Sequence, residues 1–87
     1  AFAASDDEYR NAVAMLEAEL EARRENLSAP TIVAVEENLA IIDAAISEAR
    51  QALARDPSSA DLPLLLAGVY RQKVDLLRQA VELSRES

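Results

Sequence analysis

The chain has 87 residues, which is enough for one small domain. Half of them are apolar (51%), but aromatic residues make up only 3% and there is a single Gly, a composition typical of long helices joined by few turns. The net charge of −7 argues against nucleic-acid and anionic-membrane partners, and the lack of Cys and His excludes disulfides, thiol nucleophiles, imidazole bases and the usual zinc sites within this chain.

The first predicted helix covers residues 6–26. Ser5 and Glu8 have the spacing of a capping box, in which each side chain bonds the backbone amide of the other residue. Apolar residues then recur at steps of three and four, at Tyr9, Val13, Leu16 and Leu20. This stripe is narrow, and we expect the first helix to pack along the second.

The second predicted helix covers residues 29–55, between the start signal Ser28-x-Pro30 and the stop signal Asp56-Pro57. Its long apolar seam consists of Ile32, Val35, Leu39, Ile42, Ile46, Ala49 and Leu53. A flanking strip of smaller residues runs beside the seam, through Ala34, Ile41, Ala45 and Ala52. Asn38 also lies beside the seam, either as a boundary residue or as a polar residue that sets the register of an interface.

The third predicted helix covers residues 61–85, with Asp61 as its N-cap and Pro63 in its first turn. Two adjacent apolar stripes follow, which make a face wide enough for two neighbouring helices. One stripe is Leu62, Leu66, Val69, Leu76, Ala80 and Leu83, and the other is Ala67, Tyr70, Val74, Leu77 and Val81. Gly68 costs helix stability, so we expect either a close approach of another helix or a slight kink there.

These elements predict an all-α domain over residues 1–87, a three-helix antiparallel bundle in which the second and third helices form a long hairpin and the first is shorter. Helices of these lengths make a thin layer that leaves apolar area uncovered, so we expect self-association through the second and third helices. The residues predicted for that interface are Ile41, Ala45, Ala52, Leu66, Val69, Tyr70 and Leu77.

We expect no enzyme activity, because the chain has no nucleophile with a base to activate it. Neighbouring acids such as Glu36 and Glu37 point in different directions from a helix and suit a solvated face. No catalytic residue, cofactor site or metal site is therefore predicted. No apolar run reaches the roughly 20 residues of a membrane span, so no span is expected within these residues.

Two stretches resemble known families. The stretch ALARDPSSADLPLLLAGVY resembles the junction between tetratricopeptide repeats, and the fit rests on Ala52, Leu53, Asp56, Pro57, Ala60, Leu66 and Tyr70. A repeat would turn shortly after its Tyr, whereas here YRQKVDLLRQAVEL continues the helical stripes, and no second copy follows at a 34-residue period. This resemblance implies an alternative function, a helical-repeat fragment that binds a peptide or protein partner.

A broader resemblance covers residues 8–83, most clearly VEENLAIIDAAISEARQALARDP and YRQKVDLLRQA. These are similar to the region after the membrane span in bacterial zinc-finger anti-sigma factors and related membrane proteins. The resemblance implies a non-catalytic, periplasmic or otherwise extracytoplasmic helical domain, sensory or oligomerising, tethered by a span outside these residues. It transfers no sigma-binding residue, because the His/Cys ligands and the span of that family have no counterpart in this chain.

Overall fold

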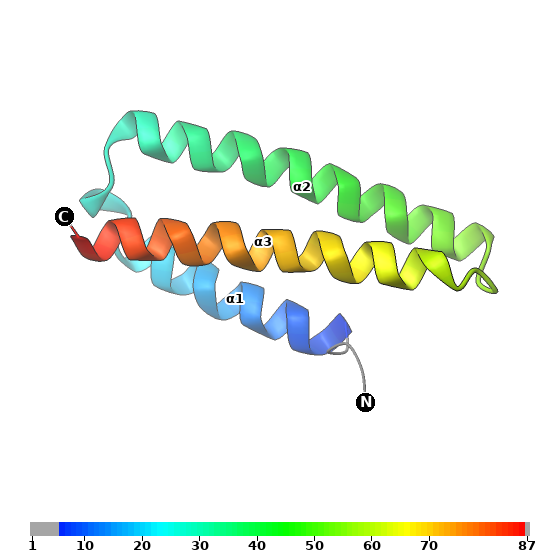
Figure 1. Ribbon diagram of the computed structural model, residues 1–87. Helices are drawn as coiled ribbons and strands as arrows, with labels where there is room; N and C mark the ends of the chain where they lie inside the picture. The colour runs from blue at the N-terminus through cyan, green and yellow to red at the C-terminus, as the bar shows by residue number, and fades with distance from the viewer. Residues whose placement is uncertain (1–5, 87) are drawn as a thin grey trace.

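The computed structural model describes residues 6–86, which fold into three long α-helices and one short 3₁₀ helix (Figure 1). The elements are α1 (Asp6–Ala22), η1 (Arg24–Asn26), α2 (Ala29–Arg55) and α3 (Asp61–Glu86). The predicted all-α class is confirmed. The first helix is shorter than predicted, because its last turn tightens into η1. The predicted capping residue Ser5 lies outside the described residues.

Local signals explain where α2 and α3 begin. The Ser28 hydroxyl accepts a hydrogen bond from the backbone amide of Thr31 at 3.3 Å, which caps α2 as the sequence suggested. At α3 the capping residue differs from the prediction. The Leu62 amide donates to the Ser59 hydroxyl at 3.2 Å, and Asp61 already belongs to the first turn, where its carboxylate suits the positive helix end.

The three helices form a flat layer with α3 in the middle (Figure 1). Its Cα extents are 46 × 26 × 14 Å. Both α1 and α2 pack on α3, so the prediction that the first helix packs along the second is wrong. The reason lies in the two adjacent stripes of α3, which offer α1 a wider apolar contact than the flank of α2 does. As a result α1 runs parallel to α3, and α2 runs antiparallel to it.

The core consists of two clusters, one on each side of α3. Between α2 and α3 the buried residues are Ile46, Ala49, Leu66, Val69 and Tyr70. Between α1 and α3 they are Val13, Val74 and Leu77, with Tyr9, Leu16 and Leu39 packed against them. At the far end, the buried Ser84 anchors η1, because its carbonyl oxygen accepts a hydrogen bond from the Asn26 side chain at 3.2 Å.

Ion pairs bridge α1 and α2 where the two helices face each other across α3. The Lys73 ammonium lies 2.6 Å from the Asp43 carboxylate of α2 and 3.9 Å from the Glu17 carboxylate of α1. The two carboxylates are exposed although Lys73 itself is half-buried, and pairs open to water on one side add little stability, typically below about 1 kcal/mol each. They do identify the side of α2 that faces α1, which is the side carrying Asp43.

Gly68 does not mark a helix contact. A Cβ atom added at this position would meet nothing within 4 Å, so the predicted close approach of another helix is wrong within the described chain. Gly68 lies inside the continuous helix α3, where its lack of a side chain only lowers helix propensity.

Candidate functional site

The structure divides the residues predicted for the interface into two groups. Leu66, Val69, Tyr70 and Leu77 are buried in the core of the chain itself, because α1 and α2 both pack on this part of α3. Of the other three residues, Ile41 is 69% exposed, whereas Ala45 and Ala52 are half-buried and Ala45 also packs against the core cluster between α2 and α3. Surface available to a partner is therefore found among the second group.

Helical geometry places Ile41 on the side of the α2–α3 hairpin opposite α1. Ile41 lies two residues from Asp43, which is about 200° of rotation around α2. On α3, Leu76 lies at the same two-residue offset from Val74, which packs against α1. We call this surface the hairpin face and define it by seven residues: Ala34, Ile41, Ala45 and Ala52 of α2, and Leu65, Leu76 and Leu83 of α3.

The hairpin face is apolar and carries no charge at its centre. Leu65 is 55% exposed and Leu83 is 47% exposed. The residues between them on the same side of α3, Gln72 and Gln79, are polar but uncharged. On α2, Glu37 and Glu48 lie along the outer edge of the face, so the stretch without charge is the part formed by α3. Depletion of charge around exposed apolar side chains is typical of the centre of a protein interface.

Asn38 lies at the edge of the hairpin face and is exposed. Its side-chain amide donates a hydrogen bond to the Ala34 carbonyl at 2.8 Å, one turn earlier in the same helix. The Asn38 amide therefore has a hydrogen-bond acceptor in its own helix while it stays exposed, as expected for a boundary residue.

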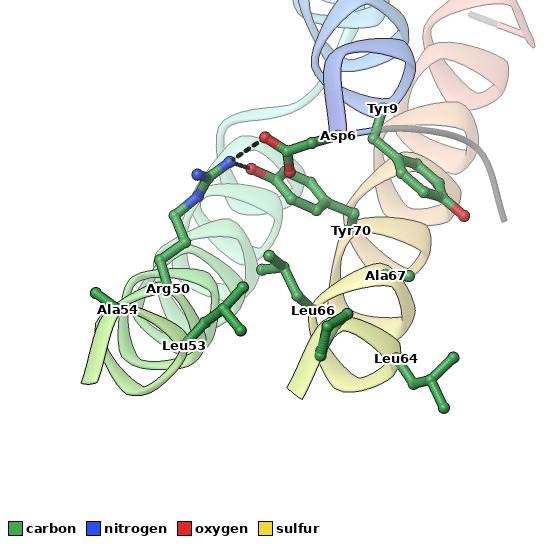
Figure 2. Close-up of a pocket in the computed structure, with 10 residues that line it drawn as sticks. Asp6, Tyr9, Arg50, Leu53, Ala54, Leu64, Leu66, Ala67 and Tyr70 are labelled. Atoms are coloured by element: carbon green, nitrogen blue, oxygen red, sulfur yellow. Dashed lines mark hydrogen bonds and ion pairs between the residues drawn. The ribbon is translucent and has the colours of Figure 1, made fainter. Parts of the chain in front are cut away.

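A second feature, which we call the end cleft, lies beyond Asp6, where the hairpin continues past the described part of α1. It has a volume of about 710 Å³, within the usual range for ligand pockets. Figure 2 shows its lining, which is mostly apolar and comprises Asp6, Tyr9, Arg50, Leu53, Ala54, Pro63, Leu64, Leu66, Ala67 and Tyr70.

Arg50 closes one side of the end cleft by linking all three helices (Figure 2). Its guanidinium donates to the Asp6 carboxylate at 2.8 Å and to the Tyr70 hydroxyl. Tyr70 in turn stacks on Tyr9, with ring centroids 5.7 Å apart. The hydrogen bonds to Tyr70 and then to Asp6 raise the pKa of Arg50, so the guanidinium keeps its charge at any working pH.

Sequence reasoning missed the role of Arg50. A signal was present, because an antiparallel hairpin turning near residue 58 brings Arg50 close to the level of Tyr70. What the sequence did not reveal is that α1 begins at the same level and contributes Asp6.

Among residues 6–86, no group of three or more His, Cys, Asp or Glu side chains is placed to hold a metal ion. Every buried side-chain nitrogen or oxygen in the same range has a hydrogen-bond partner. The end cleft is thus a mostly apolar recess, in which Arg50 donates hydrogen bonds to Asp6 and Tyr70.

Comparison with known proteins returned no matching family model, curated protein or solved structure. Within residues 6–86, none of the helices combines the length and hydropathy that a membrane span requires.

Proposed function

We propose that this chain is a non-catalytic helical domain that mediates protein–protein contact, and that the hairpin face is its contact surface. The observation that carries the proposal is the uncharged apolar surface formed by Ile41, Leu65, Leu76 and Leu83 on the side of the hairpin opposite α1. Covering such a surface removes apolar area from water without desolvating a charge, so protein association is favourable there.

The resemblance over residues 8–83 supplies the context. We propose that the chain is the extracytoplasmic part of a membrane-tethered signalling protein similar to zinc-finger anti-sigma factors. In that setting the domain would act by changing contacts outside the membrane rather than by chemistry. The unbroken course of α3 to Glu86 supports this proposal over a tetratricopeptide-like fragment, which would turn soon after Tyr70.

Peptide binding is the second candidate, and the end cleft is the observation that favours it. A cleft of about 710 Å³ between two helices could take apolar side chains of an extended or helical peptide. Leu64, which lines the end cleft and is 68% exposed, would then contact the peptide.

Site-specific photo-crosslinking in cells that make the full-length protein tests these proposals. We would place a benzophenone side chain at Ile41, at Leu64 or at the control position Met15, which is exposed on α1 away from both surfaces. The main proposal predicts a crosslinked protein at Ile41 and none at Met15. A crosslink at Leu64 alone would favour the peptide-binding candidate. No adduct at either position would contradict both.

A reporter fusion tests the location. Alkaline phosphatase needs disulfide bonds that form outside the cytoplasm. When it is fused after Glu86 of the full-length protein, we expect an active enzyme. An inactive fusion, with a cytoplasmic fluorescent reporter active at the same position, would contradict the extracytoplasmic assignment.

A further inference from the structure

We propose that the hairpin face binds the same face of a second copy of this chain, around a two-fold axis parallel to α2 and α3. This inference rests on the proposed function and names its partner. It is argued from the register of the hairpin, the sizes of the side chains that would meet, the charges at the rim and the area available.

The register of the hairpin is set by contacts across it. The Lys73 ammonium lies 2.6 Å from the Asp43 carboxylate, and Ile46 and Ala49 pack in one cluster with Leu66 and Val69. In this register, three residues of α2 each have a residue of α3 at the same height along the hairpin, to within about one residue, or ~1.5 Å. The pairs are Ala34 with Leu83, Ile41 with Leu76, and Ala52 with Leu65.

Two-fold symmetry parallel to the helices lays α2 of one copy on α3 of the other without changing these levels. Leu83 then meets Ala34 of the second copy, and Leu65 meets Ala52 of the second copy. At the centre of the contact, Leu76 meets Ile41 of the second copy, whereas Ala45 lies four residues, or ~6 Å, further along α2. Large side chains thus face small ones at both ends of the contact, which is the condition for close packing.

The charges at the rim of the hairpin face are compatible with this arrangement. Glu37 on the outer edge of α2 comes level with Gln79 of the second copy, and Glu48 comes level with Gly68 and Val69, so neither acid is level with another acid. At the end of the contact, Arg55 comes level with Asp61 of the second copy. Each Arg–Asp pair occurs twice by symmetry, which brings opposite charges together in a chain with net charge −7.

Arg55 and Asp61 are also available for this pairing. Neither forms an ion pair within the described residues, although they flank the same turn.

The area is sufficient for a stable dimer. At ~1.5 Å per residue, α2 is about 40 Å long, and two packed helices are about 20 Å wide. The hairpin face therefore offers roughly 800 Å² per copy, which is the size of a standard protein interface.

Disulfide trapping tests the geometry, because the chain contains no Cys of its own. We would prepare Ala34→Cys and Leu83→Cys as separate variants, both at exposed positions that leave the core intact. After mild oxidation, the mixture should give a disulfide-linked product of twice the 9.5 kDa chain mass. Each variant alone should not, because its two cysteines lie on opposite edges of the dimer, beyond disulfide reach.

The other outcomes would overturn the inference. A disulfide formed by one variant alone would require a different symmetry axis, and no disulfide from the mixture would exclude this face as the contact between copies. Met15→Cys mixed with Leu83→Cys is the matched control and should give no product. If Ile41 instead photo-crosslinks to a different protein, the proposed function stands and the second copy is excluded as its partner. If Ile41 gives no crosslink at all, both fail.

Discussion

Leu77 is fully buried between α1 and α3 and belongs to the cluster that holds α1 in place. We expect Leu77→Ala to lower the free energy of unfolding by about 2–5 kcal/mol, because it removes buried methyl groups and leaves a cavity. Urea denaturation followed by circular dichroism measures this loss. Leu64→Ala, at an exposed position, is the control and should change the free energy by less than about 0.5 kcal/mol.

Substitution of Gly68 should stabilise the fold rather than destabilise it. Its Cβ position is open and it lies inside α3, so Gly68→Ala should raise the free energy of unfolding by about 0.5–1 kcal/mol. Thermal denaturation would show this as a higher midpoint. A lower midpoint would mean that another chain approaches Gly68 closely, contrary to the open space found here.

At the residue scale, the sequence predicted which side chains are apolar and share a face, but not what covers them. Tyr70 and Leu77 were assigned to a contact with another copy, whereas α1 and α2 bury them within the chain. A stripe of apolar residues predicts that one side of a helix is buried. Which helix buries that side depends on how all three helices pack together, and the pattern of one helix does not determine this.

At the element scale, Arg50 links α2 to the first turn of α1 and to Tyr70. We expect Arg50→Met to lower stability by about 1 kcal/mol and to speed amide exchange in the first turns of α1, since two hydrogen bonds to a charged group are lost. Arg78→Met, at an exposed arginine of α3, is the control. Equal exchange in both variants would show that Arg50 does not anchor α1.

The direction of the Arg50 pKa shift determines how the stability contributed by its hydrogen bonds depends on pH. The pKa of Arg50 is raised in the folded chain, so its contribution is complete below the ordinary arginine pKa and is lost only as pH rises above that strongly basic range. We therefore expect the stability difference between the native chain and Arg50→Met to be constant from pH 6 to pH 9. A difference that falls within this range would contradict the assignment.

Helix boundaries were well predicted where capping chemistry is local. Ser28 and Pro30 start α2, and Asp56-Pro57 follows its last residue. The start of α3 was less well predicted, because Ser59 and Asp61 are both good capping residues and only the turn geometry decides between them. The packing partner of α1 was wrong because chain order suggested α2, whereas the broad apolar face belongs to α3.

At the scale of the whole molecule, the flat arrangement around α3 explains both candidate surfaces. Among residues 6–86, the layer of helices leaves one side of the α2–α3 hairpin without a packed helix, and this side is the hairpin face. The end cleft lies where the described part of α1 stops short of the turn between α2 and α3 (Figure 1). The flanking strip of Ile41, Ala45 and Ala52 was predicted from the sequence, but its counterpart on α3, Leu65 and Leu83, became visible only once the position of α1 was known.

The molar mass of the chain in solution tests the central claim most directly. Light scattering coupled to size exclusion should give twice the 9.5 kDa chain mass at micromolar concentration. Ile41→Glu should give 9.5 kDa with an unchanged helical spectrum, because Ile41 is exposed and a charge there opposes only the contact between copies. Met15→Glu should behave like the native chain. A native chain that remains at 9.5 kDa throughout, or a dimer that persists in Ile41→Glu, would contradict self-association through the hairpin face.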